Sequence, residues 1–153
     1  PTPRPTATPI PPNAADYYQL GENYYNAGLY QAAIDQFTVA IQIQPNHLYA
    51  LWTRALAYLK SGQHQKGIQD LNVVIALDPY NSTHYGNRGT AYDSLGQPGL
   101  ALEDYNYAIW LNPTDGLAYN NRGILYSNLG QAELALSDWN TACSLDTRLC
   151  FDR

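Results

Sequence analysis

The side chains of this sequence that could do chemistry are three histidines, two cysteines and a modest number of acids and bases. His47, His64 and His84 do not form a spacing that is typical of metal ligands. The sequence contains no glycine-rich phosphate loop, no serine nucleophile elbow and no Cys–His nucleophile signature. We therefore predict no catalytic residue, no metal and no cofactor, and we expect that the chain is not an enzyme.

The two cysteines, Cys143 and Cys150, lie close together near the end of the chain. A disulfide between them would fasten the last residues to the helix before them, and would fit an oxidising compartment. The alternative is a small buried apolar residue and a free thiol. The sequence leaves both open.

Paired charges recur along the chain. Three arginines stand at one fixed interval, and three aspartates stand at the same interval, whereas the first stretch of the chain has Leu20 and Gln36 at the corresponding positions. Because the two charges occur together and are missing together, we predict the partly buried ion pairs Arg54–Asp70, Arg88–Asp104 and Arg122–Asp138. The alternative is that they are independent surface charges inherited from a duplicated ancestor.

These charges belong to a repeat that occurs four times, over residues 14–47, 48–81, 82–115 and 116–149. Its period of about 34 residues is typical of helical repeat arrays, and apolar residues at spacings of three and four predict two helices in each unit. A glycine separates the two helices, because glycine readily adopts the left-handed conformation that ends a helix. A proline, as at Pro45, ends the second helix, and we expect Asn46, Asn81 and Asp115 to cap the helices that follow. The recurring glycines and tyrosines are Gly28, Gly62, Gly96 and Gly130, and Tyr24, Tyr58, Tyr92 and Tyr126.

The repeat resembles the tetratricopeptide repeat family. The first unit carries the family motif as Tyr17-x2-Leu20-Gly21-x2-Tyr24, followed by Ala33-x3-Phe37 and Pro45. The resemblance implies an all-α, right-handed superhelical solenoid of four helix-turn-helix units. It also implies a protein–protein interaction function without naming the partner.

In this family the inner, concave face is lined mainly by first-helix residues. Chaperone-binding members hold a terminal carboxylate there with lysines and arginines, and this chain offers little beyond Lys60. Tyrosine, tryptophan and asparagine instead suit an extended peptide, a glycan or a Pro-rich strand, unless they only solvate helix faces. The corresponding residues are Tyr18, Glu22, Tyr25 and Asn26; Tyr49, Trp52, Leu56 and Lys60; Asn87, Thr90 and Asp93; and Asn120, Asn121, Ile124 and Asn128.

Residues 1–13 differ from the repeats. Residues 1–12 hold six prolines and three threonines, a composition that favours extended polyproline II. We expect either a stiff spacer or a mucin-like arm that is O-glycosylated at Thr2, Thr6 and Thr8. Such segments resemble the linkers beside export signals or anchors in bacterial envelope proteins.

Composition limits the partners. The formal net charge is −5, which argues against nucleic acid. A membrane span needs an apolar run of about 18 residues or more, and the sequence has no such run. An extracellular or cell-envelope location is favoured, and a cytoplasmic one stays open.

Two functional hypotheses remain for this interaction scaffold. The chain is a structural subunit that stacks head to tail into a filament, because only the tail of residues 150–153 follows the last unit. The arm would then contact a neighbouring subunit or carry glycans. Alternatively, it is a tethered adaptor that binds a peptide in its groove.

Overall fold

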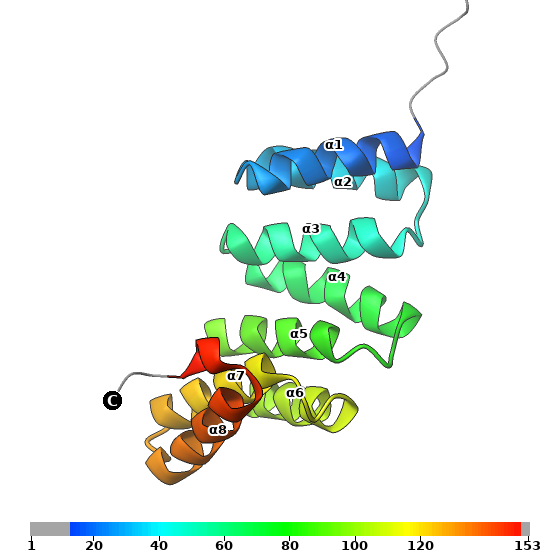
Figure 1. The fold of residues 1–153 in the computed structure, drawn as a ribbon. Helices are drawn as coiled ribbons and strands as arrows, with labels where there is room; N and C mark the ends of the chain where they lie inside the picture. The colour runs from blue at the N-terminus through cyan, green and yellow to red at the C-terminus, as the bar shows by residue number, and fades with distance from the viewer. Residues whose placement is uncertain (1–12, 151–153) are drawn as a thin grey trace, which may run out of the picture.

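The computed structural model describes residues 13–150, which form eight α-helices and a short 3-10 helix, with no strand in that range (Figure 1). The predicted all-α solenoid of four helical hairpins is confirmed. The predictions for Thr2, Thr6, Thr8 and the rest of residues 1–12, and for residues 151–153, lie outside the described residues. The elements are α1 (Ala14–Asn26), α2 (Tyr30–Ile43), α3 (Leu48–Lys60), α4 (His64–Leu77), α5 (Ser82–Ser94), α6 (Pro98–Leu111), α7 (Gly116–Asn128), α8 (Ala132–Leu145) and η1 (Thr147–Leu149).

The turn inside each hairpin is made by a glycine with positive φ. Gly28 has φ 75°, and its N–H donates to the Tyr25 carbonyl, while the next N–H, of Leu29, donates to the Tyr24 carbonyl. This pair of bonds satisfies carbonyls that the helix end leaves unpaired, in the manner of a Schellman motif. The same bonds recur around Gly62, Gly96 and Gly130.

The first helix of each unit is capped by the residue just before it. Asn81 and Asp115 accept backbone N–H bonds as predicted, at 3.1 Å each. The prediction for Asn46 is wrong, because the cap of α3 is His47, whose Nδ1 accepts from the Ala50 N–H at 3.2 Å. The repeat register explains the error, since His47 and not Asn46 occupies the position that Asn81 has in the next unit. Asn13, which the sequence assigns to the arm, caps α1 in a capping box with Asp16.

Close helix packing within a unit depends on a glycine opposite an aromatic ring. A Cβ on Gly21 would lie 2.5 Å from Phe37, and a Cβ on Gly89 would lie 2.9 Å from Tyr105. Gly123 faces Trp139 in the same way, at 2.8 Å. The second unit has Ala55 and Leu71 at these positions, both fully buried. The smaller leucine therefore leaves room for the methyl group that the aromatic rings exclude.

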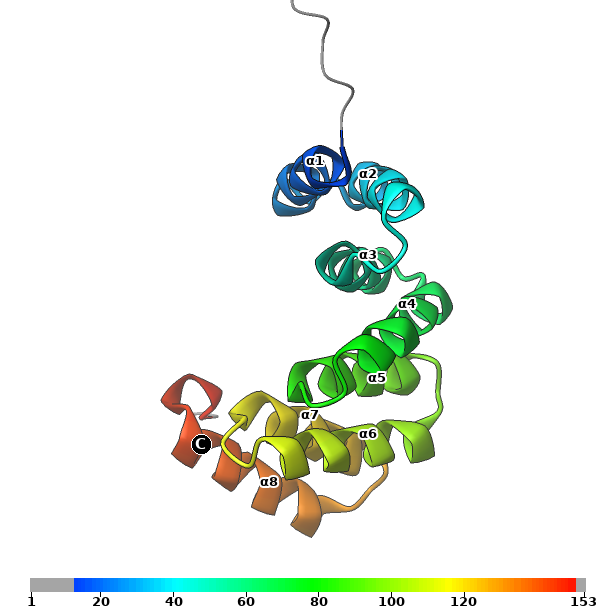
Figure 2. The same cartoon turned by 90° about the vertical axis from the view of Figure 1, so that its right-hand side faces the viewer.

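The helices form two layers that curve together (Figure 2). The first helices contact one another in series, α1 with α3, α3 with α5 and α5 with α7, whereas no second helix contacts another second helix within residues 13–150. The spacing between units is therefore shorter on the side of the first helices. That side is the inner face, which is turned to the viewer in Figure 1.

The last helix is followed by a short cap that folds back. η1 packs on α8 and α7, and a Cβ on Gly116 would lie 3.1 Å from the Leu149 side chain. Cys143 and Cys150 form a disulfide with Cα atoms 4.5 Å apart. The covalent bond fastens η1 to the last helix, so part of the outer face of unit four is covered by the chain itself.

Candidate functional site

The three arginine–aspartate pairs connect successive units as well as the two helices of one unit. Each guanidinium donates two bonds to its aspartate at 2.7 or 2.8 Å. A third donor, Nη1, reaches a side-chain oxygen of the preceding unit. These oxygens belong to Thr38, Asn72 and Asn106, at 3.0, 2.8 and 2.7 Å from Arg54, Arg88 and Arg122.

The environment of these pairs keeps the charges in place. Asp104 is 5% exposed, and the Arg88 guanidinium lies over the rings of Tyr85 and Tyr92 at 5.6 and 5.8 Å. The hydrogen bond to Asp104 raises the pKa of Arg88, so the arginine stays charged. The predicted ion pairs are thus structural connectors between units.

Several predicted groove residues are occupied with one another. The Tyr18 hydroxyl donates to Glu22 at 2.6 Å, and burial, together with Glu22, raises the pKa of Tyr18 to about 12. Tyr25 stacks near Tyr30 with ring centroids 5.6 Å apart. Thr90 accepts from the Tyr105 hydroxyl at 3.2 Å. These side chains shape the inner face by holding each other in place.

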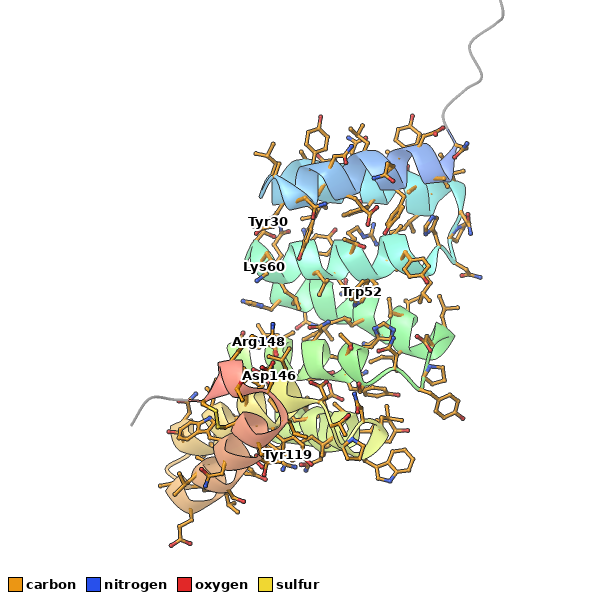
Figure 3. The ribbon with its side chains drawn as sticks, in the orientation of Figure 1. Tyr30, Trp52, Lys60, Tyr119, Asp146 and Arg148 are labelled. Atoms are coloured by element: carbon orange, nitrogen blue, oxygen red, sulfur yellow. A yellow bond between two sulfur atoms is a disulfide. The ribbon has the colours of Figure 1, made fainter. Side chains whose placement is uncertain are left out.

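Other predicted groove residues are more open. Lys60 lies at the end of α3, where Figure 3 labels it on the face turned to the viewer. A second cation, Arg148, is 88% exposed on η1 and is held by Asp146 at 2.7 Å. Asn26 and Asn128 are also exposed, whereas Leu56, Asn87, Asp93 and Asn121 are half-buried. Ile124 is 40% exposed, and the Oδ1 atom of Asn120 is buried without a hydrogen-bond partner.

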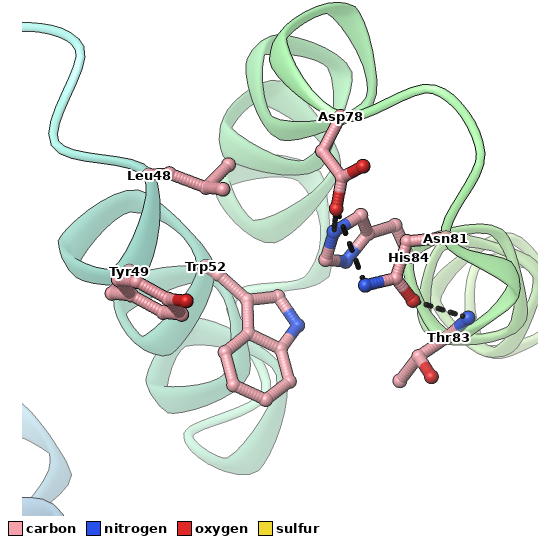
Figure 4. A pocket seen from close by; sticks show the side chains of 7 residues that line it. All are labelled: Leu48, Tyr49, Trp52, Asp78, Asn81, Thr83 and His84. Atoms are coloured by element: carbon pink, nitrogen blue, oxygen red, sulfur yellow. Dashed lines mark hydrogen bonds and ion pairs between the residues drawn. The ribbon is translucent and has the colours of Figure 1, made fainter.

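A pocket of about 280 Å³ opens between the starts of α3 and α5, and two predicted groove residues, Tyr49 and Trp52, line it (Figure 4). Tyr49 is largely exposed at the entrance. The Trp52 indole lies edge-on to the His84 ring, with centroids 6.1 Å apart. The rest of the wall comes from Leu48, Asp78, Asn81 and Thr83.

The chemistry of this pocket centres on His84. His84 is 4% exposed, and its Nε2 lies 3.1 Å from Asp78 Oδ2. Burial lowers the pKa of His84, so the ring is neutral near pH 7, with the proton on Nε2 facing Asp78. Its Nδ1 is then an acceptor, and it has no hydrogen-bond partner.

The opposite wall has the complementary defect. The Trp52 Nε1–H is also buried without a partner, and in Figure 4 the indole nitrogen is on the side of the ring that faces His84. A buried donor and a buried acceptor that lack partners each cost free energy until something bonds to them. The pocket thus has apolar walls and one unmet donor and acceptor.

The sequence analysis missed His84 and Asp78. Histidine at position 84 corresponds to Ala50 and Ala118 in the neighbouring units, and both alanines are buried. A buried alanine position that becomes histidine in one unit was the signal that could have identified the pocket.

The described residues hold no group of three or more His, Cys, Asp or Glu side chains that could bind a metal ion. None of the helices in residues 13–150 has the length and apolar character that a membrane span requires.

Four tetratricopeptide repeat models match the sequence, over residues 14–47, 49–79, 84–115 and 105–137. The chain belongs to the tetratricopeptide repeat family. The match over 105–137 begins in α6 and ends in α8, so it spans two units of this tetratricopeptide repeat protein. No curated protein sequence matches the chain.

Solved structures share the fold. MamA from Desulfovibrio magneticus RS-1 is 24% identical, with a TM-score of 0.84 over 89% of this chain and 77% of that one. TTC0263, a tetratricopeptide repeat protein of Thermus thermophilus, is 25% identical, with a TM-score of 0.77 over 88% of this chain and 75% of that one. The first tetratricopeptide repeat domain of Spaghetti (RPAP3), bound to the HSP90 peptide SRMEEVD, is 26% identical, with a TM-score of 0.73 over 77% of this chain and 94% of that one.

Proposed function

We propose that this protein is a non-enzymatic scaffold that binds an extended segment of a partner protein along its inner face. The observation that carries the proposal is the pocket between α3 and α5, where the unpartnered groups of Trp52 and His84 meet. The similar RPAP3 domain holds a peptide, which supports the same use of the fold here.

The pocket suits one side chain of the partner. Its volume of about 280 Å³ is small, and the rings of Tyr49 and Trp52 offer apolar faces to an aliphatic or aromatic stem. A neutral group that accepts from the Trp52 N–H and donates to His84 Nδ1 would satisfy both buried atoms. A hydroxyl or a primary amide has this pair of functions.

A selection of displayed random peptides against the full chain tests the proposal. We expect enrichment of a peptide whose affinity falls about tenfold in His84→Ala, because one hydrogen bond to a buried group is worth about 1.4 kcal/mol. His84→Ala restores the residue found at this position in two other units, so the fold should tolerate it. Trp52→Asn, which introduces the residue of unit four, should weaken binding further.

The control is Val73→Thr, which changes an exposed residue of α4 to its counterpart in unit four. It should leave the affinity unchanged. The proposal fails if no peptide is enriched, or if all three variants bind the selected peptide as the wild type does.

Head-to-tail stacking is a second candidate. Leu134, Leu136 and Leu145 of α8 are between 40% and 49% exposed, and a neighbouring molecule could cover them. Against it, Leu20 offers no guanidinium of the kind that joins the other units. Sedimentation velocity over a wide concentration range decides, because a monomer at every concentration removes this candidate.

We also propose a location outside the cytoplasm, where the disulfide of Cys143 and Cys150 would persist. In that compartment Thr2, Thr6 and Thr8 could carry sugars. Intact mass of the protein purified from its source tests the modification, and a mass equal to that of the bare sequence contradicts it.

A further inference from the structure

Unit three carries a row of three stacked aromatic side chains that other units lack, and we name it the aromatic ladder: Tyr85, Tyr107 and Trp110. Ring centroids are 4.6 Å apart between Tyr85 and Tyr107, and 5.3 Å apart between Tyr107 and Trp110. Exposure rises along it, from 9% through 39% to 68%. The ladder therefore runs from the core into solvent, and this feature is independent of the inner-face pocket.

The repeat does not need these outer rings for packing. The position of Trp110 is occupied by Gln42, Ala76 and Ser144 in the other units, and that of Tyr107 by Val39, Val73 and Thr141. All four second helices form with whichever residue is present. An exposed tryptophan next to an exposed tyrosine is thus specific to this unit and has no role in the shared fold.

The base of the ladder is fixed. The Tyr85 hydroxyl donates to the Pro79 carbonyl at 3.0 Å, and the Arg88 guanidinium lies 5.6 Å from the centre of the Tyr85 ring. Arg88 is in turn held by Asp104. A ring stack anchored in this way presents its outer faces in a fixed orientation, which lowers the entropy cost of binding.

The surroundings of the ladder are acidic. Glu103 is exposed and lies four residues before Tyr107 and seven before Trp110, so the three share one face of α6. The sequence of α6, PGLALEDYNYAIWL, contains no lysine or arginine. A ligand for this surface should combine flat apolar rings with a positive charge.

We propose that the aromatic ladder binds the Pro-rich segment of residues 1–12 of the same chain. Proline rings in an extended segment stack well on exposed tyrosine and tryptophan. The segment has six prolines, and Arg4 is its one charged side chain, opposite in sign to Glu103.

The length of the segment permits this contact. Helices alternate in direction, so the start of α1 and the end of α6 lie at the same edge of the array (Figure 1). From α1 through α3 and α5 to α6 there are three helix-to-helix steps of about 10 Å each, or roughly 30 Å. Twelve residues of polyproline II, at about 3.1 Å per residue, span about 37 Å.

Nuclear magnetic resonance of the full chain, labelled with ¹⁵N and ¹³C, tests the proposal. We expect nuclear Overhauser contacts from the Trp110 ring to proline protons of residues 1–12. We also expect backbone order parameters above about 0.6 at Thr6, Thr8 and Ile10. Trp110→Ala, with the residue of unit two, should remove the contacts and lower the order parameters below about 0.6.

The control is Trp52→Tyr, which places the residue of unit one in the pocket and should leave the order of residues 1–12 unchanged. Loss of order in that variant would place the segment on the inner face and overturn the proposal. So would equal order in wild type and Trp110→Ala, or contacts that arise only between differently labelled molecules. Perturbation of Trp110 by added oligosaccharides, without contacts to the segment, would also overturn it.

Discussion

The connector formed by Arg88 and Asp104 allows a sharp test, because the chain contains its own apolar replacement. Unit one has Leu20 and Gln36 where unit three has this pair. We predict that Arg88→Leu alone is strongly destabilising, and that the double variant Arg88→Leu with Asp104→Gln is much less so.

The magnitude follows from burial. The Arg88 and Asp104 side chains are 20% and 7% exposed, so removing the guanidinium leaves a buried carboxylate without its cation. Such an unpaired charge costs about 3–5 kcal/mol, whereas replacing both partners by uncharged residues is often close to neutral. The arginine also loses its bond to Asn72 at 2.8 Å, worth about 1 kcal/mol. We therefore expect a loss of about 4 kcal/mol for Arg88→Leu and of about 1–2 kcal/mol for the double variant.

Urea unfolding followed by circular dichroism at pH 7 measures these free energies for wild type, both single variants and the double variant. The coupling energy of the cycle should be about 2–3 kcal/mol. Additive effects, with a double variant as unstable as the sum of the singles, would show that the two charges act independently and would refute the account of the connector.

Three further predictions concern His84, Gly89 and Cys150. Burial beside Asp78 lowers the pKa of His84 below 6.5, so its contribution to stability is complete above pH 6.5 and is lost as the pH falls through the folded-state pKa. In thermal unfolding scans between pH 7 and 5, wild type should lose more stability than His84→Ala, and parallel losses would contradict this. Gly89→Ala should cost about 1–3 kcal/mol because its Cβ meets Tyr105; urea unfolding should show partial recovery when Tyr105→Leu is added, and no recovery would count against the packing argument. Cys150→Ser should lower the free energy of unfolding by about 2 kcal/mol, and a reductant should destabilise the wild type but leave this variant unaffected.

The sequence predicts the repeated parts of the fold well. Each interface is encoded several times, so Gly28 and its counterparts, or Arg54 with Asp70, are identified by recurrence alone. The same logic covers Gly21 and Phe37, because a small residue recurs where a large ring packs. These features follow from local geometry and from contacts between neighbouring helices.

Features that occur once are harder to predict. His84 contacts Asp78 across the turn between α4 and α5, and Trp52 approaches from the preceding unit. None of these three residues stands at a spacing that indicates a shared pocket. Only the curvature that brings α3 and α5 together makes them neighbours, and that curvature depends on packing summed over the whole array.

The central claim is that the pocket between α3 and α5 anchors a partner segment. It is tested most directly by the indole N–H resonances of the three tryptophans while the selected peptide is added to the full chain. We predict that the Trp52 resonance shifts downfield, because its Nε1–H gains a hydrogen bond, and that the Trp110 resonance does not move. A peptide that binds with the Trp52 resonance unchanged would contradict the account.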